Sequence, residues 1–412
     1  MKKAIILLFI FISFVTAASA QTVYQWRGQN RNGVYNEKNL LKSWPAQGPQ
    51  LLWVNENVGN GFGSMSITPD RIYITGEKDT LGYLNALDLK GNLLWKSDYV
   101  KEWVKTFPGS RSTPTVVGDL IYVCSGLGNL ACFDTKTGNK KWFVDRQKDL
   151  HGQPTLHGHS ESPLVDGDKV FVTPGGKDTN VVALNRFTGK IVWVSKGMGE
   201  RPGYNAPLLI KLPQRNILVT LTAYHLLGLD AATGELLWKH EQDNTPLAER
   251  NPGYGDTHGN TVWYEKGFIY YIAGDGNGAV KLSLSADGRQ IKQVWRNKTI
   301  DNFMGGFIKL DDRIYTCTSG RKDLKCIDAN TGIVTDSLKV GTGTMIFADN
   351  MLYYYNQKGE VNLIKPAPEK MELVSTFKIT KGALEHFSHP VISNGIFYLR
   401  HGKALMAYNI KE

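Results

Sequence analysis

A short motif recurs along this chain, and it constrains the fold more than any other feature of the sequence. The motif is an Asp or Asn, two variable residues, Thr-Gly, three further residues and then Trp; we call it the tag. Complete tags run from Asp134 to Trp142, from Asn185 to Trp193 and from Asp230 to Trp238, and weaker tags begin at Asp88 and Asp328. Repeats spaced about 40–50 residues apart are typical of propellers and other repeat folds.

The chemistry of the tag predicts a tight hairpin followed by an outer strand. An Asp or Asn side chain can bond backbone N–H groups two residues on, and Gly accepts the positive φ that closes the turn. The Trp at the end of the strand buries a large area and offers an indole N–H. Alternating apolar residues at 120–123 and 130–133 predict two strands before one tag, and 162–165 predicts an innermost strand in the next unit. The repeating unit is therefore a four-stranded antiparallel meander.

Eight such units are present in the sequence. Their first three strands are expected near residues 63–89, 111–134, 160–185, 204–230, 259–285, 304–328, 343–365 and 387–409. The last unit has no fourth strand after it, whereas residues 49–53 read as a fourth strand with no unit before it. We therefore predict an all-β fold: an eight-bladed β-propeller of four-stranded antiparallel blades, its ring closed by an N-terminal strand. The seventh unit matches the repeat least well, which leaves a seven-bladed ring as the alternative.

The tags resemble the repeats of the pyrroloquinoline-quinone (PQQ) type β-propellers over nearly the whole chain after residue 20. Two further segments, Trp26–Gly33 and Ser160–Asp168, resemble a bacterial branch of that superfamily whose members are described as PQQ-like repeat proteins. The superfamily includes quinoprotein alcohol dehydrogenases and the propeller lipoprotein of the outer-membrane protein assembly machinery. The resemblance thus implies a propeller, with either quinone redox chemistry or a binding role.

The first twenty residues have the pattern of a cleaved secretory signal. A basic start precedes an apolar run from Ala4 to Val15, and the segment ends in Ala18-Ser19-Ala20, where we expect cleavage after Ala20. Residues 21–412 then form a single propeller domain, expected as a monomer in the periplasm or outside the cell. The residue directly after the expected cleavage point is Gln21 and not Cys, so no lipid anchor is expected, and no later segment is apolar for long enough to span a bilayer.

The chain is basic, with 48 Lys and Arg against 38 Asp and Glu and a net charge of +10. Such a balance favours anionic partners, for instance acidic glycans or anionic lipid surfaces. The alternative is a solvated surface with a mild bias. The sequence has no nucleic-acid-binding motif, and secretion argues against that partner, so nucleic acid is not expected.

Four cysteines occur as two pairs at matching positions of two units. Cys124 and Cys132 lie on the second and third strands of one unit, and Cys317 and Cys326 lie at the corresponding places in another. Directly opposed residues of an antiparallel pair have Cα atoms about 4.5–5.5 Å apart, which a disulfide can span. In an oxidising compartment we expect the disulfides Cys124–Cys132 and Cys317–Cys326. The alternatives are four buried free thiols, or a zinc site, which the separation of the two pairs disfavours.

The long connections between units lie on one face of the predicted ring, which we call the loop face; the tag turns lie on the opposite, tag-turn face. Loops on a rigid scaffold often carry function. Alignment on the prolines of the innermost strands places six polar residues near the central mouth of the loop face: His159, Glu161, Asn205, His258, Asn260 and His386. They could bind a hard cation, a sugar or a quinone, or they could bond neighbouring strands. Two loop arginines, Arg201 and Arg250, are further ligand-binding candidates.

Two function classes compete. The first is a non-catalytic binding or scaffold propeller whose loop face holds a protein or glycan partner. The second, implied by the resemblance, is a PQQ-dependent alcohol dehydrogenase with Ca²⁺ and an Asp base beside the quinone. The adjacent-Cys pair expected near the quinone of those enzymes is missing, and the chain has little length for insertions that cover it.

We therefore favour the scaffold, with no cofactor, no metal site and no assigned catalytic residue. A third class, a glycan-active enzyme, would need a paired acid and base, for which Glu161 and Asp256 are the candidates on the loop face.

Overall fold

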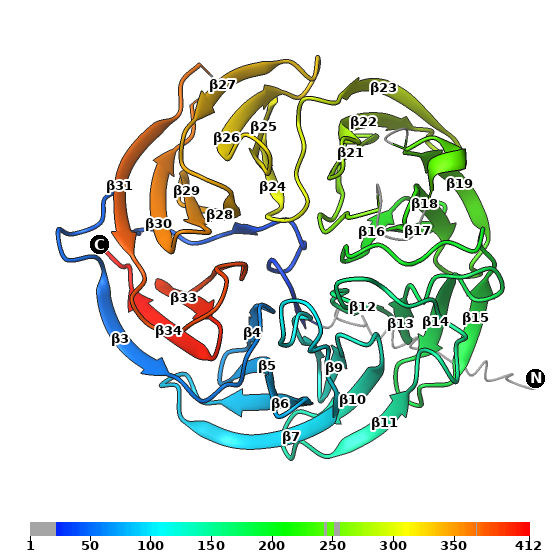
Figure 1. The fold of residues 1–412 in the computed structure, drawn as a ribbon, viewed down its shortest axis with the longest axis horizontal. Coiled ribbons are helices and arrows are strands. Elements are labelled where there is room, and N and C mark those ends of the chain that lie inside the picture. The colour runs from blue at the N-terminus through cyan, green and yellow to red at the C-terminus, as the bar shows by residue number, and fades with distance from the viewer. Residues whose placement is uncertain (1–21, 243–244, 251–255, 368) are drawn as a thin grey trace, which may run out of the picture.

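The computed structural model describes residues 22–242, 245–250, 256–367 and 369–412, and these residues form a closed ring of β-sheets (Figure 1). Eight separate sheets surround a central axis, so the predicted all-β class and the eight-bladed count are confirmed and the seven-bladed alternative is wrong. In the described part of the chain, the helix η1 (Leu247–Glu249) is one short turn, and no helix is long and apolar enough to cross a membrane. The predicted secretory signal, residues 1–20, lies outside the described residues.

The blades follow one another in chain order, and each is an antiparallel meander. Blade 1 contains β4 (Met65–Ile67), β5 (Ile72–Lys78), β6 (Leu81–Leu87) and β7 (Leu93–Lys101), and blade 2 contains β8 (Thr115–Val117), β9 (Leu120–Cys124), β10 (Leu130–Asp134) and β11 (Lys140–Val144). Blade 3 contains β12 (Leu164–Asp166), β13 (Lys169–Val172), β14 (Val181–Asn185) and β15 (Ile191–Ser195), and blade 4 contains β16 (Leu208–Lys211), β17 (Asn216–Leu221), β18 (His225–Asp230) and β19 (Leu236–Glu241). Blades 5 to 7 are built from β20 (Trp263–Glu265), β21 (Phe268–Ala273), β22 (Gly278–Leu284), β23 (Ile291–Asn297); β24 (Phe307–Leu310), β25 (Arg313–Thr318), β26 (Asp323–Asp328), β27 (Val334–Leu338); and β28 (Gly343–Ala348), β29 (Met351–Asn356), β30 (Glu360–Lys365), β31 (Glu372–Lys378). Blade 8 combines β32 (Val391–Ser393), β33 (Ile396–His401) and β34 (Ala404–Asn409) with the N-terminal β3 (Gln50–Asn55).

The ring closes in blade 8 as the sequence predicts. Strand β3 pairs antiparallel with β34, with Leu51 opposite Tyr408 and Trp53 opposite Ala407. Because the N-terminal strand supplies the fourth strand, the last blade is as complete as the others, and the predicted closing strand is confirmed.

Each tag Trp joins its blade to the next one. The indole of Trp193 in blade 3 donates to the Ala231 carbonyl in the tag turn of blade 4, at 3.2 Å. A Cβ on Gly234 of that turn would lie 2.5 Å from the Trp193 ring, so only Gly fits beneath the indole. Trp53 in the closing strand repeats the contact with the Leu89 carbonyl of blade 1, at 3.1 Å. The tag therefore connects neighbouring blades through its Trp and also forms a turn within its own blade.

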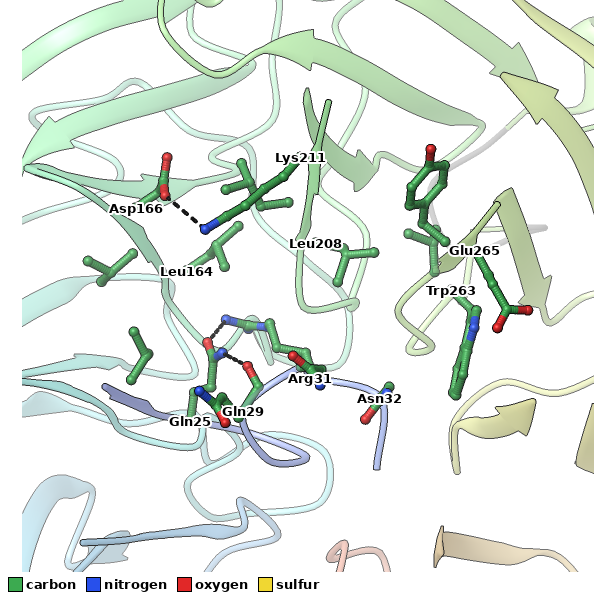
Figure 2. Close-up of a pocket in the computed structure, with 16 residues that line it drawn as sticks. Gln25, Gln29, Arg31, Asn32, Leu164, Asp166, Leu208, Lys211, Trp263 and Glu265 are labelled. Atoms are coloured by element: carbon green, nitrogen blue, oxygen red, sulfur yellow. Dashed lines mark hydrogen bonds and ion pairs between the residues drawn. The ribbon is translucent and has the colours of Figure 1, made fainter. Parts of the chain in front are cut away.

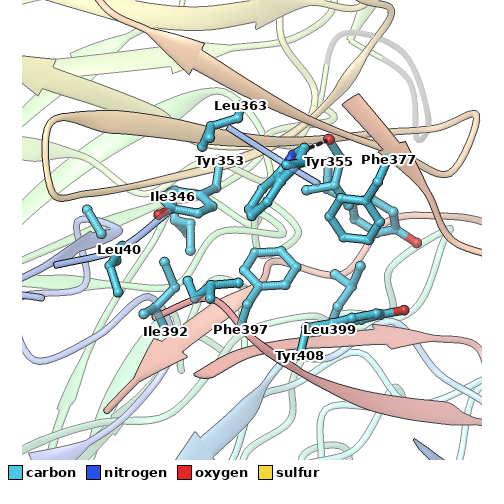
Figure 3. Close-up of a cluster of buried hydrophobic side chains, with 14 of the residues drawn as sticks. Leu40, Ile346, Tyr353, Tyr355, Leu363, Phe377, Ile392, Phe397, Leu399 and Tyr408 are labelled. Carbon is cyan, nitrogen blue, oxygen red and sulfur yellow. Dashed lines mark hydrogen bonds between the residues drawn. The ribbon is translucent and has the colours of Figure 1, made fainter. Parts of the chain in front are cut away.

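Blade 7 lacks a tag Trp, and the N-terminal segment supplies a substitute. Trp44 donates its indole N–H to the Val361 carbonyl at 3.0 Å, between blades 7 and 8. Figure 3 shows the cluster around it, in which the rings of Tyr353 and Phe397 stack with their centroids 5.9 Å apart. In the repeat that matches the pattern least well, a residue of the N-terminal segment thus takes the place of the missing Trp.

Before it reaches blade 8, the N-terminal segment crosses the middle of the ring (Figure 1, dark blue). Strand β1 (Val23–Tyr24) pairs with the innermost strand of blade 2, and β2 (Val34–Tyr35) pairs in parallel with the innermost strand of blade 7. Residues 25–33, which we call the plug, therefore span the central channel between these two blades. The sequence reasoning did not predict the plug, although Trp26–Gly33 carried part of the family resemblance.

The predicted disulfides are wrong, because the strand register does not bring the cysteines into direct opposition. Cys124 lies opposite Leu130, while Cys132 lies opposite Tyr122. Backbone bonding between Ser125 and Asn129 closes the turn and sets this register. Diagonal neighbours in a sheet have Cα atoms about 7–8 Å apart, beyond the usual disulfide range.

The second pair has the same offset. Cys317 lies opposite Leu324, and Cys326 lies opposite Tyr315. All four cysteines are buried free thiols, which was the alternative considered from the sequence.

Candidate functional site

Two buried arginines fix the plug in the channel. Arg27 donates to the carbonyls of Met345 and Phe307, at 3.1 and 2.9 Å, and so ties the plug to blades 7 and 6. Arg31 donates to the carbonyls of Ser162 and Pro163 beside blade 3, at 2.6 and 3.0 Å. Burial lowers the pKa of Arg27 to about 10 and that of Arg31 to about 9, so both guanidinium groups stay charged at neutral pH.

The plug divides the channel into two cavities, one towards each face. The cavity on the loop face, which we call the basin, has a volume of about 490 Å³ and has Trp26 of the plug among its lining residues. Its lining is rich in aromatic rings, which come mainly from the segments that lead into the innermost strands: Phe62, Phe107, His157, Tyr204, Phe303, Phe387 and His389. An apolar concave surface of this size with a few polar groups is the usual form of a binding site.

The aromatic wall of the basin is packed ring against ring. The Phe387 ring centroid lies 5.4 Å from that of Phe62 and 5.7 Å from that of Phe107. The backbone at Phe107 has a positive φ of 50°, which is unusual for a bulky residue. Arg111 stabilises it by donating to the carbonyls of Phe107 and Gly109, at 2.6 and 2.5 Å. Arg111 therefore holds this loop in the conformation that places the Phe107 ring in the basin wall.

None of the six polar residues predicted at the mouth is among those lining the basin. Glu161 accepts from the Thr173 N–H at 3.0 Å and from His159 at 3.1 Å, and both side chains are buried. Asn205 accepts from the Leu221 N–H at 3.2 Å. These groups bond the second strand of their own blade, which was the alternative interpretation given above.

The remaining three are also engaged in protein contacts. His258 bonds the Ala223 carbonyl at 3.1 Å, and Asn260 donates to the Ile272 carbonyl at 3.1 Å. His386 bonds the Tyr355 hydroxyl and stacks on His401 with centroids 3.8 Å apart.

Several residues that do line the basin are immediate neighbours of those candidates in the sequence. Ser160 and Ser162 flank Glu161, and Tyr204 and Ala206 flank Asn205 in the same way. In extended chain, successive side chains point to opposite sides, so a prediction that is one residue out of phase selects the buried side. The residues three positions before the aligned prolines, Arg111, Ser160, Tyr204 and Phe387, all line the basin. That position was the signal that could have found it.

The two predicted loop arginines lie away from the basin. Arg201 forms an ion pair with Asp256, and Arg250 forms one with Glu241 at 2.6 Å. The Arg250 guanidinium also lies over the Tyr224 ring, 4.7 Å from its centroid. Since Asp256 is paired with Arg201 and Glu161 with His159, these carboxylates are not placed as a joint acid and base.

A quinone with Ca²⁺ can be tested against the residues that line the basin. PQQ is polyanionic, so it needs several cationic donors, and Ca²⁺ needs several oxygen ligands. The lining holds one arginine, Arg111, which is committed to its own loop, and one carboxylate, Asp275, which accepts from the Thr257 N–H at 2.8 Å. Within the described residues, no three His, Cys, Asp or Glu side chains gather where they could hold a metal ion. This donor set does not fit the cofactor.

Relatives of this chain fall into two groups. A quinoprotein ethanol dehydrogenase from Pseudomonas aeruginosa is 30% identical over 142 residues, which is 32% of this chain and 22% of that enzyme. The match therefore spans about a fifth of the dehydrogenase. The outer membrane protein assembly factor BamB from Shewanella oneidensis is 22% identical over 315 residues, covering 72% of this chain and 69% of that protein.

Solved structures give the same fold. The crystal structure of BamB from Moraxella catarrhalis superposes with a TM-score of 0.62 at 13% identity, covering 88% of this chain and all of that one. The family described as outer membrane protein assembly factor BamB, a family of PQQ-like repeats, matches residues 80–337. That span is more than half of the sequence, and the chain belongs to this family of PQQ-like repeat β-propellers.

Proposed function

We propose that this protein is a non-catalytic binding propeller of the bacterial cell envelope, which holds a protein partner on its loop face. The observation that carries the proposal is the aromatic basin, together with exposed apolar side chains on the loops around the same face. Relatives over most of the chain are named outer membrane protein assembly factors, and an assembly factor is expected to act by binding other proteins.

Exposed apolar residues occur on six of the connections between blades. They are Val104, Phe107, Leu156, Met198, Leu247, Met304 and Leu384. Single exposed apolar residues are ordinary on a protein surface, but a set that recurs on one face beside an apolar cavity is typical of an interaction site. Phe107 and Met304 belong to both the set and the basin lining.

The basin fits an apolar or aromatic anchor from a partner chain. Binding energy at protein interfaces concentrates on a few side chains that fill well-packed central cavities, with a polar rim around them. Here the cavity wall is rigid, because Phe387 packs on Phe62 and Phe107. Arg111 and Asp275 add one cationic and one anionic group to the lining. A loop or extended segment that presents a large apolar side chain is the expected ligand.

Site-specific photocrosslinking in the native host tests the proposal. A photoreactive phenylalanine analogue at Met304, which is 38% exposed, should give a discrete adduct with another envelope protein. The same analogue at Phe187, 54% exposed on a tag turn, is the matched control and should not give that adduct. Phe303→Ala, which removes part of the basin wall, should reduce the Met304 adduct. An adduct from Phe187 alone would place the partner on the other face and reject the proposal.

The alternative is a PQQ-dependent dehydrogenase, which the relatedness to quinoprotein ethanol dehydrogenases keeps in consideration. Titration of the purified protein with PQQ and Ca²⁺, followed by dye reduction with simple alcohols, tests it. Stoichiometric binding with alcohol-dependent turnover would replace the scaffold proposal, whereas the donor set of the basin leads us to expect neither.

A further inference from the structure

A second cavity lies on the opposite side of the plug from the basin, towards the tag-turn face. It has a volume of about 590 Å³ and is lined by the plug and by the innermost strands of blades 3, 4 and 5 (Figure 2). Asp166, Lys211 and Glu265, at the ends of these strands, come just before the first-to-second strand turns, which share this face with the tag turns. We call it the tag-face cavity.

We propose that the tag-face cavity is a second binding site, specific for a short neutral saccharide. The tag turns themselves offer few free groups, because their Asp and Thr side chains bond the turn backbone, as Asp134 bonds the Thr137 N–H at 2.9 Å. The plug supplies the free groups that the turns lack. The proposal does not depend on the partner-binding role of the loop face.

Unengaged amides of the plug face this cavity. Gln29 and Asn30 are exposed in its lining, and neither side chain has a hydrogen bond to another described residue. Gln25 differs, since it donates to the Gln29 carbonyl at 2.8 Å and accepts from Arg31 at 2.9 Å. An amide has donors and acceptors side by side, which suits the hydroxyl groups of a sugar because each hydroxyl both donates and accepts.

An aromatic side chain lines the same cavity as these amides. Trp263 of β20 is partly buried, packs against Phe307 at a centroid distance of 6.3 Å and lines the cavity. Figure 2 shows its indole on the side of the cavity with Glu265, while Asp166 and Lys211 lie on another side. The electron-rich face of an indole attracts the C–H groups on the apolar face of a sugar ring. An aromatic face combined with amides fits a saccharide better than it fits a purely apolar ligand.

The charges of the residues that line the cavity cancel, which argues for a neutral ligand. Two cationic groups, Arg31 and Lys211, are matched by two carboxylates, Asp166 and Glu265, and Glu265 also pairs with Lys309 outside the lining. Arg31 is committed to backbone carbonyls, and Lys211 lies 3.9 Å from Asp166. A strongly anionic ligand would meet both carboxylates, and a cationic one would meet Lys211. A polyol can instead hydrogen-bond to either charge.

Calorimetry and saturation-transfer NMR on the purified protein test the proposal, with cellobiose, maltose and N,N′-diacetylchitobiose as the probes. We expect saturable binding of at least one disaccharide. Trp263→Ala should weaken it at least tenfold. The double variant Gln29→Ala, Asn30→Ala should weaken it severalfold with no change in melting temperature, because both amides are solvent-exposed. Phe303→Ala in the basin is the matched control and should leave saccharide affinity unchanged.

Three outcomes would overturn the inference. The first is the absence of saturable binding for all three disaccharides. The second is binding that survives both the Trp263 change and the double amide change. The third is binding that Phe303→Ala abolishes and Trp263→Ala spares, which would place the sugar in the basin. Crosslinking from Met304 reports on the loop face separately, so failure here leaves the proposed partner-binding function standing.

Discussion

Arg27 gives the sharpest test of how the plug is held. Its side chain is 2% exposed and donates to the carbonyls of Met345, Phe307 and Asn32 at 3.1, 2.9 and 2.9 Å. Two substitutions separate the contributions of these bonds and of packing. Arg27→Ala removes the bonds and leaves a void, whereas Arg27→Met removes the bonds but fills most of the space.

The expected losses follow from these contacts. Hydrogen bonds to a charged group contribute about 1.5–3 kcal/mol each, but they are not additive when one side chain makes all of them. Either substitution leaves three carbonyls without this donor, which costs about 1–3 kcal/mol for each buried group and about 3–5 kcal/mol in total because the losses do not simply add. The Nε of Arg27 has no hydrogen-bond partner in the described part of the chain, which favours the lower half of that range. We therefore expect a loss of about 3 kcal/mol for Arg27→Met and about 4 kcal/mol for Arg27→Ala.

Urea unfolding followed by tryptophan fluorescence measures both losses. The control is Lys42→Met, which breaks the ion pair with Asp349; Lys42 is 47% exposed and the change should cost less than about 1 kcal/mol. If both Arg27 variants unfold within about 0.5 kcal/mol of the unchanged protein, the plug is not held by these bonds. If Met restores nearly all of the stability lost with Ala, packing rather than hydrogen bonding holds it.

Three further predictions follow from the structure. Trp53→Ala should lower the free energy of unfolding by about 2–3 kcal/mol in the same urea assay, less than for a fully buried Trp because Trp53 is half-buried. A loss under about 1 kcal/mol would mean that the contact of Trp53 with blade 1 does not stabilise the closed ring. In denaturant without reductant, Ellman's reagent should titrate all four thiols. It should react slowly with the native protein, where burial raises the pKa of Cys124 well above its ordinary value. A titration that finds two or four thiols fewer would restore the predicted disulfides. Burial, with neighbouring His401, lowers the pKa of His386 from 6.5 to about 4. Its contribution to stability is therefore complete above pH 6.5 and is lost as the pH falls towards 4, because the unfolded chain binds the proton first. In the His386→Asn variant, the melting temperature should therefore depend less on pH between 6.5 and 4 than it does in the unchanged protein. The same pH dependence in both proteins would contradict the assignment.

The repeat pattern made the fold predictable because each tag carries its own local chemistry. The Asp or Asn, the Gly and the Trp form a turn and an outer strand wherever they occur, and eight repeating units leave few ways to arrange the chain. Even the closing strand was predictable, since Gln50–Asn55 has the outer-strand pattern without a blade of its own. The hydrogen bond from Trp193 to Ala231 of the next blade was not predictable, because the residues of one tag do not show which segment packs against its Trp.

The plug and the basin were hidden for different physical reasons. Strands β1 and β2 have two residues each, too few to show any periodicity. Arg27 and Arg31 have the composition of a solvated loop, since arginine is seldom fully buried, and only backbone carbonyls from distant blades reveal their role. The basin was missed by one position: Glu161 and Ser160 are adjacent in sequence, yet they face opposite sides of an extended segment.

Ring closure through β3 also makes the native state depend on a complete chain. Leu51 must find Tyr408, more than three hundred residues away, before blade 8 exists. Contacts of such sequence separation form slowly, and until this one forms, the backbone N–H and C=O groups of β3 and β34 that pair in the closed ring lack their partners. A chain interrupted before β34 would keep β3 unpaired, and an unpaired strand is prone to pair with another chain. The closing strand therefore makes the stability of the whole ring depend on a pairing between two segments near opposite ends of the described chain.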